Sequence, residues 1–116
     1  LRRVFVVDVL PAPNDSDESA TGFVRGVDGL SEALGRINDR TATIVGYLGE
    51  WHTHPRFHSS PPSVDDFVLL AHCARTLALD GVPALMIIVG ENGDVGYTLA
   101  ARIGVTAPGA DVRSIR

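Results

Sequence analysis

The sequence predicts an α/β domain, in which a β-sheet is flanked by helices. Runs of β-branched and aromatic residues with the length of strands alternate along the chain with stretches whose apolar residues recur at helical spacing. Turn-forming residues separate these segments, most clearly at Gly81 and at Asn92-Gly93. Such alternation is typical of α/β folds, whose helices pack on the faces of the sheet.

The N-terminal part contributes one strand and one helix to this prediction. Residues 4–9 form a nearly continuous apolar run, so we expect a strand that is buried on both faces. Residues 14–21 are acidic and small, which indicates a solvated loop, and residues 23–25 are compatible with a short strand. A helix of about three turns is predicted over residues 30–40, with Asp28 as its N-terminal cap.

The C-terminal part predicts a strand, a long helix and a hairpin. Residues 43–48 are rich in β-formers and continue as a strand into residues 50–54, and Ser63 caps a helix that ends near Asp80. Two strands flank the Asn92-Gly93 turn. They are expected at residues 84–89 and 95–101. The domain is therefore predicted to span residues 1–105, and residues 106–116 are expected to form a frayed tail or linker.

Composition narrows the class of protein. The chain has 116 residues, 45% of them hydrophobic, which is the composition of one ordinary globular domain. Its net charge of −4 argues against nucleic acid as a partner. A single cysteine, Cys73, lies in an apolar helical pattern, which indicates a buried structural thiol and a reducing compartment such as the cytoplasm. No apolar run reaches the roughly 18 residues of a membrane span, and the start at Leu1 suggests a piece of a longer protein.

The segment Glu50-Trp51-His52-Thr53-His54-Pro55 carries the strongest functional signal. Because side chains alternate along a strand, His52 and His54 project from the same side and can converge on one ion. A carboxylate at the start of the following helix, in Ser63-Val64-Asp65-Asp66, could supply a third ligand. Two histidines, one aspartate and a water are a ligand set that suits catalytic zinc.

These motifs resemble the signature of the MPN/JAMM metalloproteases, and in particular the prokaryotic JAB domains. That signature contains His-Ser/Thr-His-Pro, a short loop and Ser-x-x-Asp at the start of a helix, which is matched here by residues 52–55 and 63–66. The resemblance covers most of the chain and implies a cytidine-deaminase-like fold with a mixed central β-sheet flanked by helices. It also implies that His52 and His54 bind Zn²⁺ and that Ser63 steadies the catalytic water or the oxyanion.

The resemblance leaves the third ligand open between Asp65 and Asp66. Counting from His54 favours Asp65, whereas the Ser-x-x-Asp interval favours Asp66. Relative to the predicted apolar stripe of the helix, Asp65 points away from the core and Asp66 lies at the margin of the stripe. This stripe comprises Phe67, Leu70, Ala71, Ala74, Leu77 and Ala78. We therefore predict Asp66 as the third ligand.

The general base is not identified by these motifs. In the family it is a Glu upstream of the first histidine, near an early strand, and that region would precede Leu1. Glu50 shares a strand face with His52 and is a second candidate, and a domain without a base is a third. Arg56 and His58 could contact a substrate, but we interpret them as surface residues, and we interpret His72 as structural. Trp51, which alternates away from the two histidines, is expected to anchor the core.

Two classes of function follow. The first is a zinc-dependent peptidase or isopeptidase, whose substrates, by resemblance, are ubiquitin-like or sulfur-carrier proteins with extended C-terminal tails. Such a tail would add to the sheet as a further strand. The alternative is a non-catalytic scaffold or protein-binding module within a larger modification enzyme. The sequence determines neither the substrate nor the oligomeric state.

Overall fold

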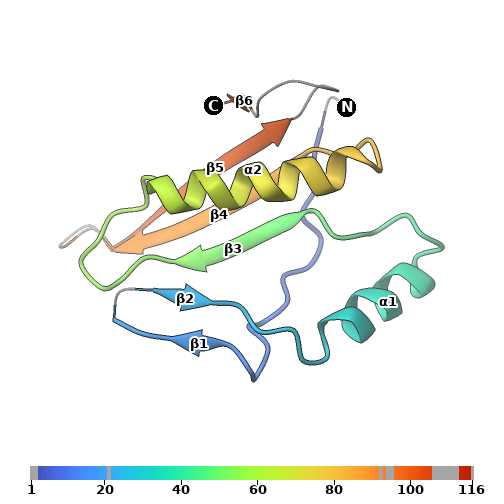
Figure 1. The fold of residues 1–116 in the computed structure, drawn as a ribbon, viewed down its shortest axis with the longest axis horizontal. Coiled ribbons are helices and arrows are strands. Elements are labelled where there is room, and N and C mark those ends of the chain that lie inside the picture. Colours follow the sequence, from blue (N-terminus) through green and yellow to red (C-terminus); the bar gives the residue numbers. More distant parts are fainter. Residues whose placement is uncertain (1–2, 21, 92, 94–95, 106–112, 116) are drawn as a thin grey trace. The chain divides into compact units, whose positions relative to one another are not determined.

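The computed structural model describes residues 3–20, 22–91, 93, 96–105 and 113–115, and these fall into two compact units. The first unit comprises residues 1–47 and the second comprises residues 48–116 (Figure 1). Within the described residues the architecture is mixed α/β, with two sheets and two helices. The predicted α/β class is therefore confirmed. Neither of these helices is long and apolar enough to cross a membrane.

The first unit contains a small hairpin and a helix. Strands β1 (Asp17–Glu18) and β2 (Phe23–Val24) pair antiparallel, so part of the predicted loop at residues 14–21 forms a strand. Helix α1 spans Leu30–Arg40, as expected. Its N-cap is Gly29 in the left-handed region at φ 70°, and not Asp28. The backbone N–H of Asp28 instead donates to Asp15 Oδ1 at 2.9 Å.

Two predicted strands of the first unit are not present. Residues 4–9 lie outside any strand, and Phe5 and Val7 are 75% and 66% exposed. A β-branched run forms a strand only where another strand pairs with it, and no described strand does so. Residues 43–48 are also not a strand. Thr43 adopts a left-handed φ of 64°, and its N–H donates to the carbonyl of Asn38 at 2.8 Å, so this segment closes the end of α1 instead.

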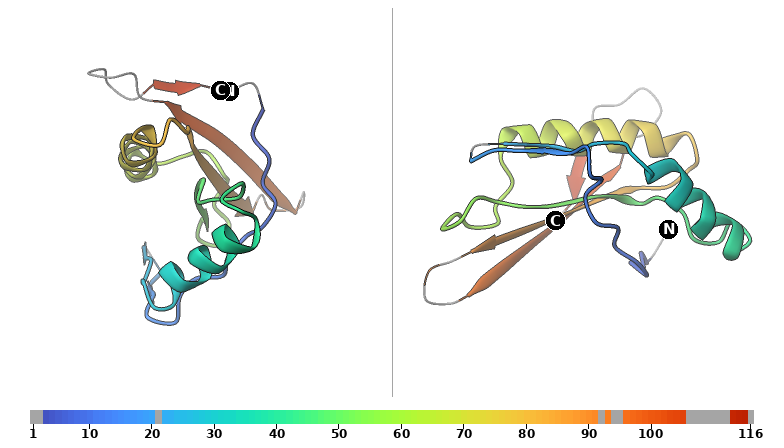
Figure 2. Two further views of the ribbon diagram at one scale, coloured as in Figure 1. Left: turned by 90° about the vertical axis from the view of Figure 1, so that its right-hand side faces the viewer. Right: turned by 90° about the horizontal axis from the view of Figure 1, so that it is seen from below.

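The second unit is a four-stranded mixed sheet with one helix on one face. Its strands β3 (Gly49–Thr53), β4 (Ala84–Glu91), β5 (Tyr97–Val105) and β6 (Arg113–Ile115) lie in that order. β3 and β4 are parallel, and the other pairs are antiparallel. Helix α2 (Val64–Ala78) connects the parallel pair, and the two views of Figure 2 place it along one face of the sheet.

The hairpin and the C-terminal segment differ from prediction mainly in length. β4 and β5 extend beyond the expected residues 84–89 and 95–101, although Asn92 and Val95 lie outside the described residues. Residues 113–115 form β6 against β5, where the sequence indicated a frayed tail. Residues 106–112 of the predicted tail are outside the described part of the chain.

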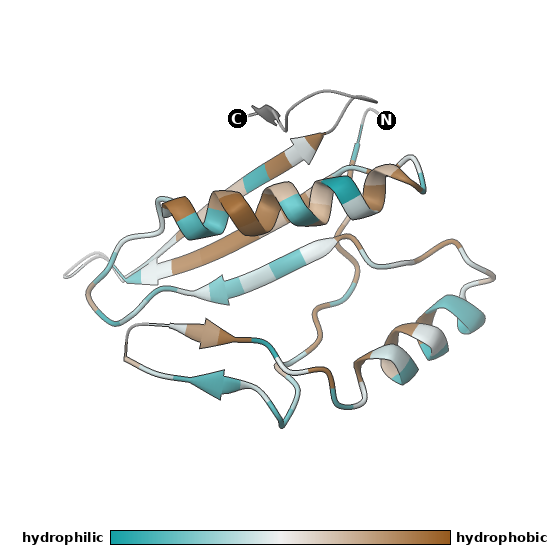
Figure 3. Ribbon diagram, viewed as in Figure 1, coloured by the Kyte–Doolittle hydropathy of each residue, from teal (hydrophilic) through white to brown (hydrophobic). Residues whose placement is uncertain are grey.

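The core lies between α2 and β4, both of which are largely apolar in Figure 3. Alternate residues of β4 are buried, which shows that one face of this strand lies under the helix. The buried apolar side chains are Leu70, Cys73, Ala74, Leu77, Ala84, Met86 and Ile88. Cys73 is buried, as predicted. The buried face of α2 is rotated away from the predicted stripe, because Phe67 is 43% exposed while Asp66 is buried.

Leu70 provides a test of this packing. It is 2% exposed and faces Gly104 of β5, where an added Cβ would lie only 3.0 Å from Leu70 Cγ. We expect Leu70→Ala to lower the free energy of unfolding by about 2–5 kcal/mol, because it leaves a cavity in the core. The matched control is Val68→Ala, two residues earlier on the exposed face of the same helix, which should change it by less than about 0.5 kcal/mol. Chemical denaturation measures both, and equal effects would contradict the described orientation of α2.

Candidate metal centre

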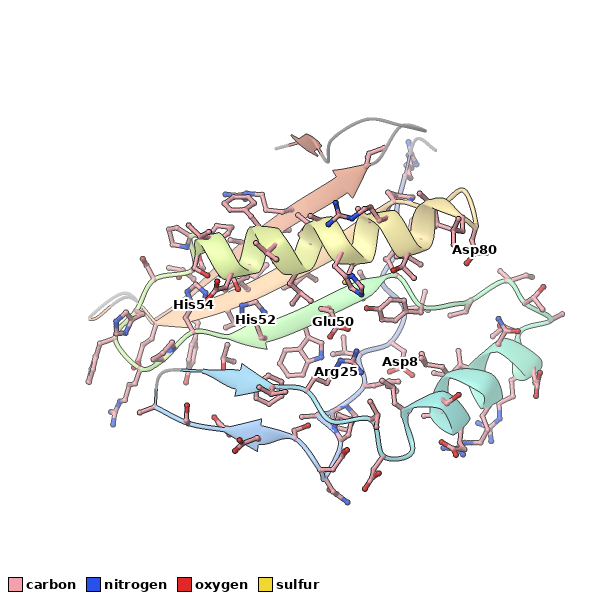
Figure 4. All side chains as sticks on the ribbon, viewed as in Figure 1. Asp8, Arg25, Glu50, His52, His54 and Asp80 are labelled. Carbon is pink, nitrogen blue, oxygen red and sulfur yellow. The ribbon has the colours of Figure 1, made fainter. Side chains whose placement is uncertain are left out.

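The two histidines reach the site from the end of β3. His52 pairs with Ile88 in the parallel register, and since Ile88 is buried beneath α2, His52 faces the same helix. His54 follows β3 directly, and its N–H donates to the carbonyl of Val89 at 2.8 Å, which extends the ladder past Thr53. The strand alternation is therefore kept, and both imidazoles lie beneath the N-terminal half of α2 (Figure 4).

Asp66 reaches the site from the first turn of α2, where a capping box fixes it. Ser63 is the N-cap, and its Oγ accepts from the N–H of Asp66 at 3.2 Å. In return, the Ser63 N–H donates to Asp66 Oδ2 at 2.6 Å, and the Ser63 hydroxyl donates to the same oxygen at 2.8 Å. Ser63 is thus the predicted cap, and together with Asp66 it forms a capping box that holds the carboxylate in one orientation.

The three side chains converge. His52 Nε2 lies 2.9 Å from Asp66 Oδ1, and His54 Nε2 lies 3.1 Å from Asp66 Oδ2. The candidate ligand atoms all lie within 4.8 Å of one another, and the two imidazole rings are 5.5 Å apart between centroids. Asp65, the alternative ligand, is exposed and is not part of the cluster. The structure thus brings together the residues that helix phase favoured, although their role as ligands remains a proposal.

The hydrogen bond of His54 shows that a proton or a cation must lie between His54 and Asp66. His54 Nδ1 lies 2.7 Å from the carbonyl oxygen of Ser59, which can only accept, so Nδ1 carries a proton. In a neutral imidazole the other nitrogen, Nε2, then presents a lone pair to the Asp66 carboxylate. Two acceptors at 3.1 Å repel each other unless a proton or a cation lies between them. The donor set of two imidazole nitrogens and a carboxylate therefore fits a divalent metal ion such as zinc.

The electrostatics of Asp66 agree with a carboxylate that stays ionised. Burial raises its pKa, but the hydrogen bonds from the backbone N–H and the hydroxyl of Ser63, with smaller contributions from the two histidines, lower it more, so the pKa lies below its ordinary value of 3.8. An ionised carboxylate is the form that binds a metal. The same group also lies in the first turn of α2, where a negative charge interacts favourably with the helix dipole.

The other sequence candidates lie outside the cluster. Glu50 is on β3 nearer to the start of the strand than His52 (Figure 4), and it is not among the groups that converge. Trp51 is 43% exposed, so its predicted role as a core anchor is wrong: it points to the face of the sheet that α2 does not cover. His72 is exposed on α2. Arg56 and His58 lie in the exposed loop between β3 and α2, as expected.

Two residues that support the site, Ser59 and Glu91, were not predicted from the sequence. Ser59 contributes only its backbone carbonyl, for which a sequence has no signal, and Glu91 at the end of β4 contacts the loop that carries Ser59. A surface pocket of about 370 Å³ adjoins His54. Its lining consists of Thr53, His54, Arg56, Val89, Gly90, Glu91 and Tyr97. Of the three residues of the cluster, only His54 lines this pocket.

The chain is similar in sequence to a known protein. The chain is 36% identical over 98 residues to a protein named CD-NTase/cGAS isopeptidase from Enterobacter hormaechei subsp. hoffmannii. The match includes 84% of this chain and 52% of the relative, so the chain spans about half of that protein's length. No family model matches the chain. The name of this relative describes it as an isopeptidase.

The lowered pKa of Asp66 gives a pH-dependent stability. Its folded pKa is below 3.8, so the stabilisation is fully present above pH 3.8 and is lost as the pH falls through the folded value. We expect the free energy of unfolding, measured by denaturation with a chelator present, to fall in this acidic range in the wild type. Asp66→Asn should be less stable at neutral pH and lose less on acidification. Parallel pH curves for the two proteins would contradict the assignment.

Proposed function

We propose that this chain is a zinc-dependent isopeptidase or peptidase domain of the JAMM type, with a JAB/MPN fold. The observation that carries the proposal is the convergence of His52, His54 and Asp66 at the end of β3. The similarity to a CD-NTase/cGAS isopeptidase supports the reaction type. The mixed sheet, with a capped helix that follows the histidine strand, is the arrangement that the sequence motifs led us to expect.

The residues of the chain have distinct tasks in this reaction. His52, His54 and Asp66 would hold the ion, and zinc would polarise the scissile carbonyl and lower the pKa of a water. The Ser59 carbonyl keeps the proton of His54 on Nδ1, so that Nε2 is available as a ligand. The Ser63 hydroxyl lies next to the cluster and donates its one proton to Asp66 Oδ2. To steady a developing oxyanion, it would turn this proton from Asp66 to the substrate.

A general base must move the proton from the water to the leaving amine. Asp66 is committed to the cluster, and within the described residues no further carboxylate joins the group. Glu50 lies on the face of β3 that carries His52, but nearer to the start of the strand. The Cα atoms of neighbouring residues on one strand face are about 6.5–7 Å apart, so the Glu50 carboxylate would have to lean towards His52 to reach a water at the metal. Glu50→Gln tests this candidate directly.

The proposed substrate is a conjugate in which the C-terminus of a ubiquitin-like protein is joined through an amide to a second protein. The relative's name points to conjugates of CD-NTase/cGAS enzymes as the first to test. A sulfur-carrier protein with a similar extended tail is a second class of substrate. The pocket beside His54 offers room for a side chain next to the scissile bond.

Metal analysis and cleavage test this proposal together. We expect one zinc per chain in the wild type, and hydrolysis of an amide at the C-terminus of a ubiquitin-like protein that stops when a chelator removes the metal. His54→Ala should lose both zinc and cleavage, because it removes a ligand. His72→Ala is the matched control, since it removes an exposed imidazole from α2 and should change neither.

The outcomes separate the enzyme from a scaffold. If the wild type holds stoichiometric zinc but cleaves neither a ubiquitin-like amide nor a CD-NTase conjugate, the scaffold alternative is favoured. If it takes up no zinc at neutral pH, the metal site itself is wrong. Loss of zinc in His72→Ala to the same extent as in His54→Ala would show that the assay reports unfolding.

Ser63 combines two roles that substitution can separate. Ser63→Ala removes the cap and the donor near the oxyanion, so we expect a loss of about 1 kcal/mol in stability and a lower kcat. Ser63→Asp keeps a capping oxygen but places a second carboxylate beside Asp66, so it should retain the helix and lose cleavage. Circular dichroism measures the first property and steady-state kinetics the second. Full activity of Ser63→Ala would remove Ser63 from the mechanism.

A further inference from the structure

The loop of residues 55–60 holds the imidazole ring of His54 in place. The carbonyl oxygen of Ser59 accepts a hydrogen bond from His54 Nδ1 at 2.7 Å. This bond fixes the rotation of the ring and its tautomer, and so directs Nε2 to Asp66. A backbone carbonyl can orient a side chain only as well as its loop is held. The contacts that fix this loop therefore act on the metal centre.

Glu91, the last residue of β4, contacts this loop with both its backbone and its side chain. Its N–H donates to the carbonyl of His58 at 2.9 Å. Its carboxylate oxygen Oε2 accepts from the N–H of Phe57 at 3.2 Å. The two bonds hold adjacent loop residues, Phe57 and His58, immediately before Ser59. Glu91 is thus connected to His54 through a short, continuous chain of contacts.

The loop lies directly on β4 at this point. A Cβ added to Gly90 would come within 2.5 Å of the carbonyl carbon of Ser59 and would also overlap the N–H of Ser60. Only a glycine permits so close an approach of two backbones. Because the loop rests on Gly90, the side chain of the next residue, Glu91, is in position to reach over the loop and accept from it.

The backbone of Phe57 explains why this acceptor matters. Phe57 has a φ of 67°, a left-handed conformation that is strained for a bulky residue. Its ring is 71% exposed, so burial does not offset the cost. The guanidinium of Arg56 lies 4.9 Å from the centre of the ring, which is a weak stabilisation at an exposed position. The turn of residues 55–58 is closed by a hydrogen bond from the His58 N–H to the carbonyl of Pro55 at 3.0 Å. The hydrogen bond from Phe57 to Glu91 is the contact from outside the turn that supports this conformation.

We propose that Glu91 is a positioning residue for the metal centre. This role rests on the proposed function. The carboxylate of Glu91 holds Phe57 in the left-handed conformation, so that the Ser59 carbonyl accepts from His54 Nδ1. The length of the Glu91 side chain determines this role, and not its charge. The ion pair of Glu91 with Arg56 is long, at 3.8 Å, and Arg56 is 78% exposed there, so it contributes little.

Two conservative variants separate reach from charge. Glu91→Gln keeps the length of the side chain and an oxygen that accepts from Phe57, but it removes the charge. Glu91→Asp keeps the charge and is shorter by one carbon, so it cannot reach the Phe57 N–H, while the backbone bond to His58 remains. We expect Glu91→Gln to bind zinc as the wild type does. We expect Glu91→Asp to bind zinc at least about 10-fold more weakly, as is typical when a partner behind a ligand is lost.

Zinc affinity is measured by competition with a chromophoric chelator, and the His54 Nδ1 proton is observed by NMR in metal-free protein. The proton bonded to Ser59 should give a resonance in the wild type and in Glu91→Gln that is lost in Glu91→Asp. Asp65→Asn is the matched control for charge, because it removes one carboxylate from the exposed side of α2. It should leave both properties unchanged.

The possible results decide the proposal. Weaker binding in Glu91→Gln than in Glu91→Asp would show that charge matters and would overturn it. Equal zinc affinity in all variants, or an unchanged His54 resonance in Glu91→Asp, would overturn it as well. If the wild type binds no zinc, the proposed function fails. In that case the His54 resonance of the metal-free variants still tests the positioning by Glu91.

Discussion

The carboxylate of Asp66 is the group on which the site depends. Its Oδ2 accepts from both the backbone N–H and the hydroxyl of Ser63, and its two oxygens lie within 3.1 Å of the two histidines. One side chain therefore completes the first turn of α2 and joins that turn to the end of β3. Since helix capping and ligand convergence share this group, substitutions of Asp66 affect folding and metal binding together, and only variants of its neighbours can separate the two.

The parts of the site that could be predicted are those that local sequence encodes. A spacing of two along a strand places His52 and His54 on one side, and the Ser-x-x-Asp interval together with helix phase favours Asp66 over Asp65. These relations need no knowledge of the rest of the fold. Ser59 and Glu91 could not be predicted in this way, because one acts through its backbone and the other reaches the loop from a distant strand.

The fold shows the same division. The capped helix α2 and the β4–β5 hairpin carry strong local signals, and both are present. Residues 4–9 and 43–48 have equally strong β-propensity but are not strands. A strand needs a neighbour with free hydrogen-bonding groups, and Thr43 at the start of residues 43–48 instead satisfies the carbonyl of Asn38 in the last turn of α1. Propensity identifies what a segment favours, whereas the availability of partners decides what it forms.

The local origin of the cluster has a consequence for folding. His52, His54 and Asp66 all come from one segment that consists of a strand end, a loop and the first turn of a helix. Closing so short a loop costs little chain entropy, and the cost rises only slowly with length. A bound cation would therefore act as a cross-link that can form before the pairing of β4 with β5. Nucleation of the second unit at this segment would make its folding rate, and not only its stability, depend on the concentration of metal.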